Sequence, residues 1–194
     1  QHLGDELEKK ERKKFKDLAQ KECWRMAEMI KSLQSFYRPS DGIFSENNMS
    51  HLLEEVLLIT GKACKNKGIE IHKNYKTGKY PFQGIEDQIK QVLLNILQNA
   101  IDSIKNGGII TLKLVQNSNE ILLQIGDTGD GIEQEKQKFI FDPFYTTKGK
   151  EGTGLGLSVS YGIIKKHGGD ISIESEINIG STVSVVLPTN RKIK

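Results

Sequence analysis

Glu151-Gly152-Thr153-Gly154-Leu155-Gly156-Leu157-Ser158 is the stretch around which the rest of the chain is arranged. Glycine occupies every second position and an apolar segment follows, which predicts a glycine loop leading into a helix from about residue 158 to 166. Glycine has no Cβ, so its backbone can turn tightly and approach a ligand closely. A helix N-terminus adds unpaired N–H groups and the positive end of the helix dipole. Phosphate is therefore the expected ligand, although flexible loops without a ligand are often equally rich in glycine.

The composition is typical of a soluble globular protein, with 194 residues, 36% hydrophobic and 27% charged. This length allows one domain with a helical appendage. The net charge of +3 is too small to favour a nucleic-acid partner. No apolar run approaches the roughly 18 residues that cross a bilayer. We therefore expect a cytoplasmic fragment without membrane contact, although the full-length parent could be membrane-anchored. Cys23 and Cys64 are then expected to be reduced thiols.

The N-terminal arm carries apolar residues at heptad spacing, namely Ala19, Cys23, Met26, Ile30, Leu33 and Tyr37. This pattern predicts a long helix that packs on another helix or on its copy in a second chain. Arg38-Pro39-Ser40-Asp41-Gly42 is expected to end the helix, because the residue before proline is disfavoured in the helical region. Residues 38–48 are then a linker.

Residues 49–190 are expected to form one α+β domain, a two-layer α/β sandwich with a mixed, largely antiparallel sheet. Helices are predicted over 50–64, with Ser50 as N-cap, and over 85–104, 133–139 and 158–166. Strands are predicted over 69–72, 109–115, 121–125, 170–174 and 182–187. The stretch 76–83 is turn-rich, 141–152 is expected to be a mobile loop, and 191–194 is a tail.

Asn95 and Asn99 lie four residues apart on the predicted helix 85–104 and therefore share a face. The remainder of that helix follows an apolar core pattern, so two amides within it need hydrogen-bond partners or a solvent-filled cleft. One interpretation is that they are ordinary polar residues of a solvated face. The other is a metal site, because an amide oxygen suits Mg²⁺, which takes its remaining ligands from water and phosphate.

Asp127 follows a predicted strand and precedes Gly129 and Gly131. A carboxylate at this place can accept a hydrogen bond from an exocyclic amine such as the N6 amine of adenine, and the two glycines would let a base lie close to the backbone. The run Asp-Thr-Gly-Asp-Gly is equally good turn chemistry, so an ordinary turn at the end of a strand is the alternative.

The predicted loop 141–152 contains the aromatic cluster Phe141-Asp142-Pro143-Phe144-Tyr145, followed by Thr146, Thr147 and Lys148. The aromatic residues either anchor the loop to the core or form the hinge of a lid whose polar tip faces phosphates. Other nucleotide motifs are excluded. No Gly-Lys pair precedes Ser or Thr, as a P-loop requires, and Leu157 occupies the final glycine position of a dinucleotide fingerprint.

Taken together, these motifs resemble the catalytic, ATP-binding domain of bacterial sensor histidine kinases, within the superfamily that includes DNA gyrase, a heat-shock chaperone and a mismatch-repair ATPase. The resemblance covers about residues 40–190. Asn95–Ala100 resembles the N box, Asp127–Gly131 the first glycine box, Phe141–Phe144 the phenylalanine box, Gly152–Leu157 the second glycine box and Gly180–Thr182 the last box. The sequence before the glycines is similar to that of nitrogen-regulation and sporulation kinases.

This resemblance implies a site for ATP and Mg²⁺ beneath a mobile ATP lid. The implied ATP-binding residues are Asn95, Asn99, Asp127, Gly129, Gly131, Ile132, Thr146, Thr147, Lys148, Gly152, Thr153, Gly154, Leu155, Gly156, Leu157, Ser181 and Thr182. Asn99 would bind Mg²⁺, Asp127 would read adenine, and Ser181 or Thr182 would place a hydroxyl near Asp127. Asn95 and Lys148 would act in catalysis, with Lys148 as a point charge.

The N-terminal arm is similar to the second helix of the family's dimerisation and phosphoacceptor hairpin, so residues 1–37 are expected to be a remnant of it. The implied partners are a second copy in the full-length protein and a response-regulator receiver domain. The family's phosphoacceptor histidine precedes an acidic residue, and none of His2, His51, His72 and His167 does so. We therefore expect the acceptor to be absent and the fragment not to phosphorylate itself.

Two further positions depart from the family pattern. Asp102 stands where many of these kinases carry a basic residue, so it receives no phosphate role. Asn178 stands where glycine is common, and Asn tolerates the left-handed conformation that such a turn requires.

Transfer of the ATP γ-phosphoryl group to a histidine is the function that the resemblance implies, chemistry that depends mainly on positioning and charge stabilisation. Asn95 stands where the superfamily's ATPases carry a glutamate that activates water, and an amide is a poor general base, which favours a kinase over a hydrolase. The alternatives are an ATP-sensing module without transfer, a superfamily ATPase and a structural domain that binds no nucleotide.

Overall fold

The computed structural model describes residues 11–20, 22–23, 26, 42–78, 80–148 and 152–189. The chain divides into two compact units, residues 1–38 and 39–194. In the first unit the described residues are helical and exposed, Ala19, Cys23 and Met26 among them. The other residues at heptad spacing lie outside the described residues, namely Ile30, Leu33 and Tyr37, and so does the predicted helix end. The packing of this arm therefore stays a prediction.

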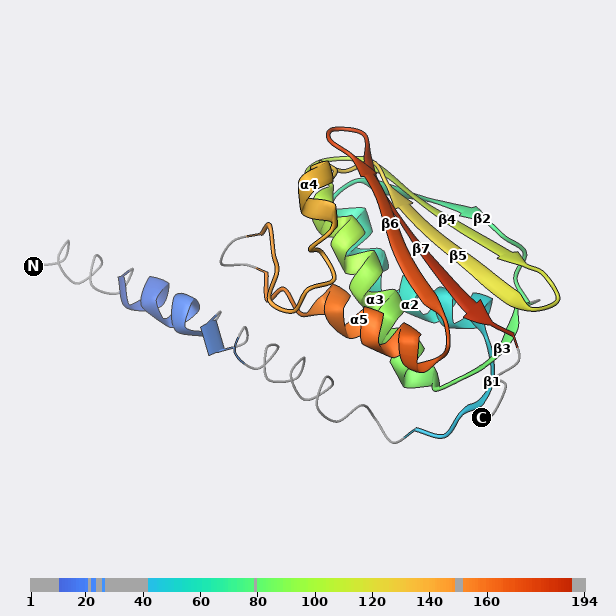
Figure 1. The fold of residues 1–194 in the computed structure, drawn as a ribbon. Helices are drawn as coiled ribbons and strands as arrows, with labels where there is room; N and C mark the ends of the chain where they lie inside the picture. The colour runs from blue at the N-terminus through green and yellow to red at the C-terminus, as the bar shows by residue number, and fades with distance from the viewer. Residues whose placement is uncertain are drawn as a thin grey trace, which may run out of the picture. The chain divides into compact units, whose positions relative to one another are not determined.

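A five-stranded sheet forms one layer of the second unit (Figure 1). In spatial order its strands are β2 (Ile69–Asn74), β4 (Gly108–Gln116), β5 (Glu120–Asp127), β7 (Gly180–Pro188) and β6 (Asp170–Glu176). β2 and β4 pair in parallel, and the other neighbouring pairs are antiparallel. The expected mixed, largely antiparallel sheet is confirmed. Asn178 in the β6–β7 turn has φ 61°, the left-handed conformation anticipated for it.

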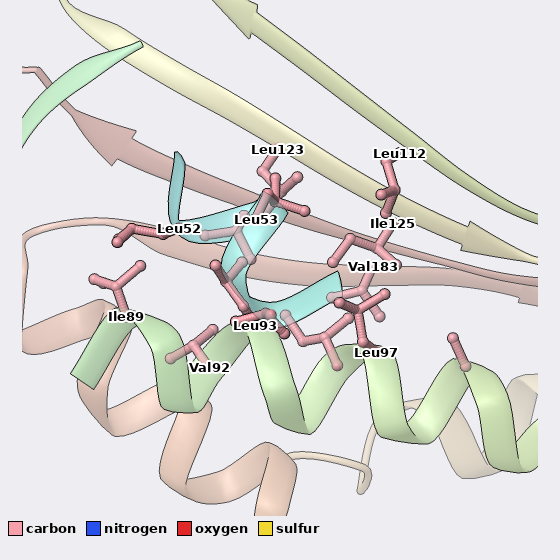
Figure 2. Packing of buried hydrophobic residues seen from close by; sticks show 14 of the residues in the cluster. Leu52, Leu53, Ile89, Val92, Leu93, Leu97, Leu112, Leu123, Ile125 and Val183 are labelled. Carbon is pink, nitrogen blue, oxygen red and sulfur yellow. The ribbon is translucent and has the colours of Figure 1, made fainter. Parts of the chain in front are cut away.

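The helices α2 (Met49–Asn66), α3 (Glu86–Ser103) and α5 (Gly156–Lys166) form the second layer. α3 packs against both α2 and α5. Its apolar side chains recur every three or four residues, which places them on one face. Those buried on this face are Ile89, Val92, Leu93, Ile96, Leu97, Ala100 and Ile101. Figure 2 shows several of them directed toward side chains of α2 and of the sheet. Burial of this apolar surface holds the two layers together.

A second, two-stranded sheet was not anticipated. β1 (Ser45–Asn48) pairs antiparallel with β3 (Pro81–Gly84), although the sequence placed these segments in the predicted linker and in the turn-rich stretch. The sequence Ser-Glu-Asn-Asn has no apolar alternation, so nothing local indicates a strand. The pairing is tertiary, and the Asn47 side chain reinforces it by donating from Nδ2 to the Gly84 carbonyl over 2.9 Å.

The start of α2 corrects the predicted N-cap. Asn48, not Ser50, is the capping residue, and its Oδ1 accepts the Ser50 backbone N–H over 3.1 Å. The Ser50 hydroxyl is fully buried, donates to the same Oδ1 and accepts the Gly78 N–H over 2.9 Å. Both residue types cap helices well, so the sequence alone did not distinguish them.

Tertiary contacts fix both ends of α3, the helix that carries the predicted amides. At its start no side chain caps the helix, and the Ile85 N–H donates to His167 Nε2 over 3.0 Å. His167 is buried, and its Nδ1 lies 2.8 Å from the Ile163 carbonyl. At its end the Lys67 ammonium donates to the carbonyls of Ile101 and Ile104 over 2.7 and 2.8 Å. These contacts satisfy backbone groups that a helix terminus leaves unpaired.

Candidate functional site

Asp127 is the last residue of β5 and lies where the sheet meets the end of α3. Its cross-strand neighbour on β4 is Ile110, a fully buried core residue, so the Asp127 side chain belongs to the helix-facing side of the sheet. Its Oδ1 accepts the Gly129 N–H over 2.8 Å and the Ser103 hydroxyl over 2.9 Å. The carboxylate is therefore held in a fixed orientation.

Burial raises the pKa of Asp127 above its ordinary value. The Gly129 N–H, the Ser103 hydroxyl and the Ser181 N–H oppose this shift, because each donates to the ionised form. Burial is the larger effect, so the carboxylate would gain from one more hydrogen-bond donor. An amine of a bound ligand would supply such a donor.

Ser181 rather than Thr182 shares a face with Asp127. Ser181 lies opposite Asp127 in the β5–β7 register, whereas Thr182 lies opposite Gly126 and so points to the other side of the sheet. The Ser181 hydroxyl is buried and lies 2.8 Å from the hydroxyl of Ser175 on β6. Of the two predicted hydroxyl donors, the geometry favours Ser181.

The residues after Asp127 are fixed by packing against neighbouring segments. A Cβ on Gly129 would overlap the Ser103 side chain, and one on Gly131, which has φ 70°, would overlap the Glu176 carbonyl. The Ile132 N–H donates to the Ser175 hydroxyl over 2.8 Å. Glycine is therefore required here by close approach within the protein itself, and a ligand is not needed to explain it.

Asn95 joins α3 to the start of α5. Its side-chain Nδ2 donates to the Gly156 carbonyl over 3.0 Å and to the Ser160 hydroxyl over 3.2 Å. Both donors of the amide are thereby used, and the amide oxygen is the group left to meet a ligand. Asn95 is half-buried, so this contact also fixes α5 against α3.

Asn99, one turn further along α3, is in contact with a cation from the predicted lid. The Lys148 ammonium donates to Asn99 Oδ1 over 3.1 Å and forms an ion pair with Asp102 Oδ2 over 2.8 Å. Gln98 Nε2 donates to the other Asp102 oxygen over 2.7 Å. Two oxygens one turn apart on α3 thus hold a positive charge.

The predicted lid, named here the lid segment, is described for residues 141–148 and 152–155. Its two described parts meet where the Phe144 N–H donates to the Gly154 carbonyl over 2.9 Å. Phe144 and Gly154 both have positive φ, 68° and 66°. The Thr146 hydroxyl accepts the Lys148 N–H over 3.1 Å, and a Cβ on Gly152 would overlap that hydroxyl. These contacts fix the backbone on either side of Lys148 and so determine where its side chain begins.

Two ring contacts anchor the base of the lid segment. Phe141 packs on Tyr161 of α5 and Phe139 packs on Tyr145, with centroids 5.6 and 5.8 Å apart. Phe144 and Thr147 are exposed. Of the two interpretations of the aromatic cluster, anchoring to the core is supported by Phe141, which packs against the core cluster. Tyr145 packs only on the exposed Phe139.

The lid segment ends at the N-terminus of α5. Leu155 is the N-cap and makes no side-chain capping bond, because its side chain carries no hydrogen-bond acceptor. Its own backbone N–H donates to Thr153 Oγ1 over 3.4 Å. The Ser158 hydroxyl donates to the Leu155 carbonyl instead of capping an N–H. α5 begins at Gly156, and the N–H groups of its first turn are therefore without a side-chain cap. Such groups attract anions.

The structure brings the predicted residues into two groups joined by α3. One surrounds Asp127 and Ser181, and the other contains Asn99 and Lys148. Sequence reasoning gave no role to Ser103 or Ser175, which hold Asp127 and Ser181. Ser103 follows Asn95 and Asn99 at the same interval of four, so the helical period places it near their face, but spacing alone does not show that it contacts Asp127.

Comparisons with known proteins identify the family of this chain. The family model described as "Histidine kinase-, DNA gyrase B-, and HSP90-like ATPase" matches residues 84–191. The chain is 35% identical over 179 residues to Sporulation kinase C of Bacillus subtilis strain 168, covering 92% of this chain and 42% of that protein. It is 36% identical over 171 residues to the signal transduction histidine-protein kinase AtoS of Escherichia coli K12, covering 88% and 28%. The chain thus spans less than half the length of these two relatives.

Solved structures show the same architecture. The catalytic domain of the histidine kinase ThkA in a nucleotide-free form matches with a TM-score of 0.70 and 31% identity, covering 76% of this chain and 99% of that one. ThkA in complex with the response regulator protein TrrA matches with a TM-score of 0.74 and 26% identity, covering 88% and 49%. Within the described residues, no helix is both long enough and apolar enough to span a bilayer.

Proposed function

Since this chain belongs to the histidine kinase-, DNA gyrase B- and HSP90-like ATPase family, we propose that residues 49–190 are the ATP-binding catalytic domain of a sensor histidine kinase. The domain transfers the γ-phosphoryl group of ATP to a histidine for relay to a response-regulator aspartate. The observation that carries the proposal is the family match over residues 84–191, which includes every candidate site residue. The similarity to ThkA, solved with a response regulator, supports the relay.

In this proposal Asp127 recognises adenine. Its Oδ1 is held by Ser103 and the Gly129 N–H, so the carboxylate can accept a hydrogen bond from an exocyclic amine at a fixed position. Guanine presents a carbonyl where adenine presents this amine, and a carbonyl facing a carboxylate leaves both acceptors without a donor. The site should therefore prefer ATP to GTP.

The phosphate end of the site lies between α3 and the start of α5. The uncapped N–H groups of the first α5 turn support phosphate binding there. Asn99 fits a Mg²⁺ role, since its amide oxygen is a hard neutral ligand and already contacts the Lys148 cation. When bound, Mg²⁺ would neutralise charge on the phosphate oxygens. Lys148 adds a second positive charge at this end.

Asn95 supports kinase chemistry over hydrolysis. Both donors of its side-chain amide are engaged by α5, and its free oxygen belongs to an amide, which does not take a proton from water at ordinary pH. Asn95 therefore positions α5 and the phosphates without activating water. We also infer that the domain acts in the cytoplasm, and that the full-length protein dimerises through the helical arm.

Phosphotransfer in trans tests the proposal. The chain is mixed with a separate dimerisation hairpin that carries a phosphoacceptor histidine and with Mg²⁺ and radiolabelled ATP. We expect acid-labile label on the hairpin, none on the chain itself, and much slower transfer by Asp127→Asn at an ATP concentration below the dissociation constant of the variant. An ATP-sensing module would bind ATP and leave the hairpin unlabelled. A superfamily ATPase would release phosphate steadily without the hairpin, and either result would refute the kinase proposal.

A further inference from the structure

We propose that Lys148 and Mg²⁺ compete for the side-chain oxygen of Asn99, and that Asp102 is the positioning residue that keeps Lys148 in place. The inference rests on the proposed role of Asn99 as the Mg²⁺ ligand. It assigns to the lid segment a contact that opposes metal binding, and it assigns to Asp102 a role that the sequence did not give it.

The competition follows from the geometry of one ammonium group. Lys148 Nζ lies 3.1 Å from Asn99 Oδ1 and 2.8 Å from Asp102 Oδ2. Asn99 and Asp102 are three residues apart on α3, so their side chains project from the same face. Lys148 reaches them from a different segment of the chain, and its backbone N–H is held by Thr146.

A metal ion and the ammonium cannot share this oxygen. Mg²⁺ binds oxygen at about 2.0–2.1 Å and requires near-octahedral geometry, so the ion would lie well inside the space that the ammonium occupies. The two groups carry like charges, which repel at such a separation. Coordination by Asn99 therefore requires the Lys148 ammonium to leave Asn99 Oδ1.

Asp102 determines whether the ammonium stays in place before the metal arrives. Its carboxylate is oriented by Gln98, which donates to Oδ1 and leaves Oδ2 directed to Lys148. The side chains of Lys148 and Asp102 are 37% and 38% exposed, so water screens the pair and the contact is weak enough to exchange. After displacement from Asn99, the ammonium remains attracted to Asp102 beside the metal site.

The side-chain ammonium resonance of Lys148 reports the contact directly, because hydrogen bonding slows the exchange of the Nζ protons with water. The resonance is assigned by its loss in Lys148→Met. In the nucleotide-free chain we expect it to be visible, and to disappear in Asp102→Asn. The Lys165 resonance is the internal control, since Lys165 pairs with Asp170 at the far end of α5 and should be unchanged. A Lys148 resonance that survives Asp102→Asn would overturn the role of Asp102.

Nucleotide addition tests the competition in the wild-type chain. An ATP analogue that is not hydrolysed, added with a chelator, should leave the Lys148 resonance in place. Subsequent excess Mg²⁺ should shift or remove it, while the Lys165 resonance stays constant. A resonance that moves with metal-free nucleotide, or that ignores Mg²⁺ although calorimetry shows the nucleotide bound, would overturn the competition. Absence of nucleotide binding in calorimetry would instead refute the proposed function. The Asp102→Asn experiment is done without nucleotide, so its result tests the role of Asp102 in either case.

Discussion

Ser103→Ala would isolate the effect of one hydroxyl group on Asp127. The hydroxyl lies 2.9 Å from Asp127 Oδ1 and 2.8 Å from the Ala100 carbonyl, so its single proton is shared between two acceptors. A hydrogen bond to a charged group contributes about 1.5–3 kcal/mol, and a neutral one about 0.5–1.5 kcal/mol. For this shared, partly buried contact we expect Ser103→Ala to lower the free energy of unfolding by about 1 kcal/mol at neutral pH.

The pH dependence gives this prediction its sign. The pKa of Asp127 is raised in the folded protein from an ordinary value of 3.8, so the folded state binds the proton more tightly than the unfolded state. The stability that Asp127 contributes is fully present below pH 3.8 and is lost as the pH rises through the pKa of Asp127 in the folded state. Without the hydroxyl the folded pKa rises further. The cost of Ser103→Ala is therefore full above that pKa and decreases as the pH falls.

Urea unfolding of both proteins at several values between about pH 4 and about pH 8 measures this difference. Ser172→Ala, which removes an exposed hydroxyl from β6, is the matched control and should show little change at any pH. A Ser103→Ala cost that is the same at both ends of the pH range would refute the proposed link between the hydroxyl and the ionised carboxylate. So would the absence of any cost at neutral pH.

Three further substitutions test the structure around the site. Lys67→Met removes the ammonium that caps α3 and should lower the free energy of unfolding by about 1–3 kcal/mol in urea, while the exposed Lys62→Met has little effect; equal effects would contradict the capping role. Gly154→Ala places a Cβ against the Phe144 backbone at φ 66° and should cost at least about 1 kcal/mol and weaken nucleotide binding; wild-type values of both would contradict this packing. Asn95→Asp replaces two donors by acceptors facing α5 and should cost about 1–3 kcal/mol; an unchanged urea midpoint would contradict the contact.

The fold was predictable from sequence where the signal is local and periodic. The helix predicted over 85–104 is α3, Glu86–Ser103, because its apolar residues recur at helical spacing along its whole length. The ends of β4 and β5 were predicted to within one or two residues, because buried and less buried residues alternate along both strands. β1 was missed because the Ser45–Asn48 strand exists only through its pairing with β3, distant in the chain.

The candidate site could be proposed from sequence as residue types and less so as contacts. Spacing and the surrounding motifs single out Asn95, Asn99 and Asp127 as candidates, and their role in binding stays a prediction. Their partners were not identified, because the contact of Ser103 with Asp127 and that of Lys148 with Asn99 join segments 24 and 49 residues apart. Such contacts depend on how α3 packs against the sheet and against the lid segment, which no local pattern records.

Calorimetry of ATP binding to the wild-type chain and to Asp127→Asn decides whether Asp127 recognises adenine. Asn presents an amide at the position where the carboxylate is proposed to accept the adenine amine. We expect the wild-type chain to bind ATP in preference to GTP, and Asp127→Asn to weaken ATP binding about 10- to 150-fold. Asp142→Asn, an exposed carboxylate in the lid segment, should bind as the wild type does. Wild-type affinity in Asp127→Asn would show that Asp127 does not recognise adenine, and no ATP binding by the wild-type chain would refute the nucleotide site as a whole.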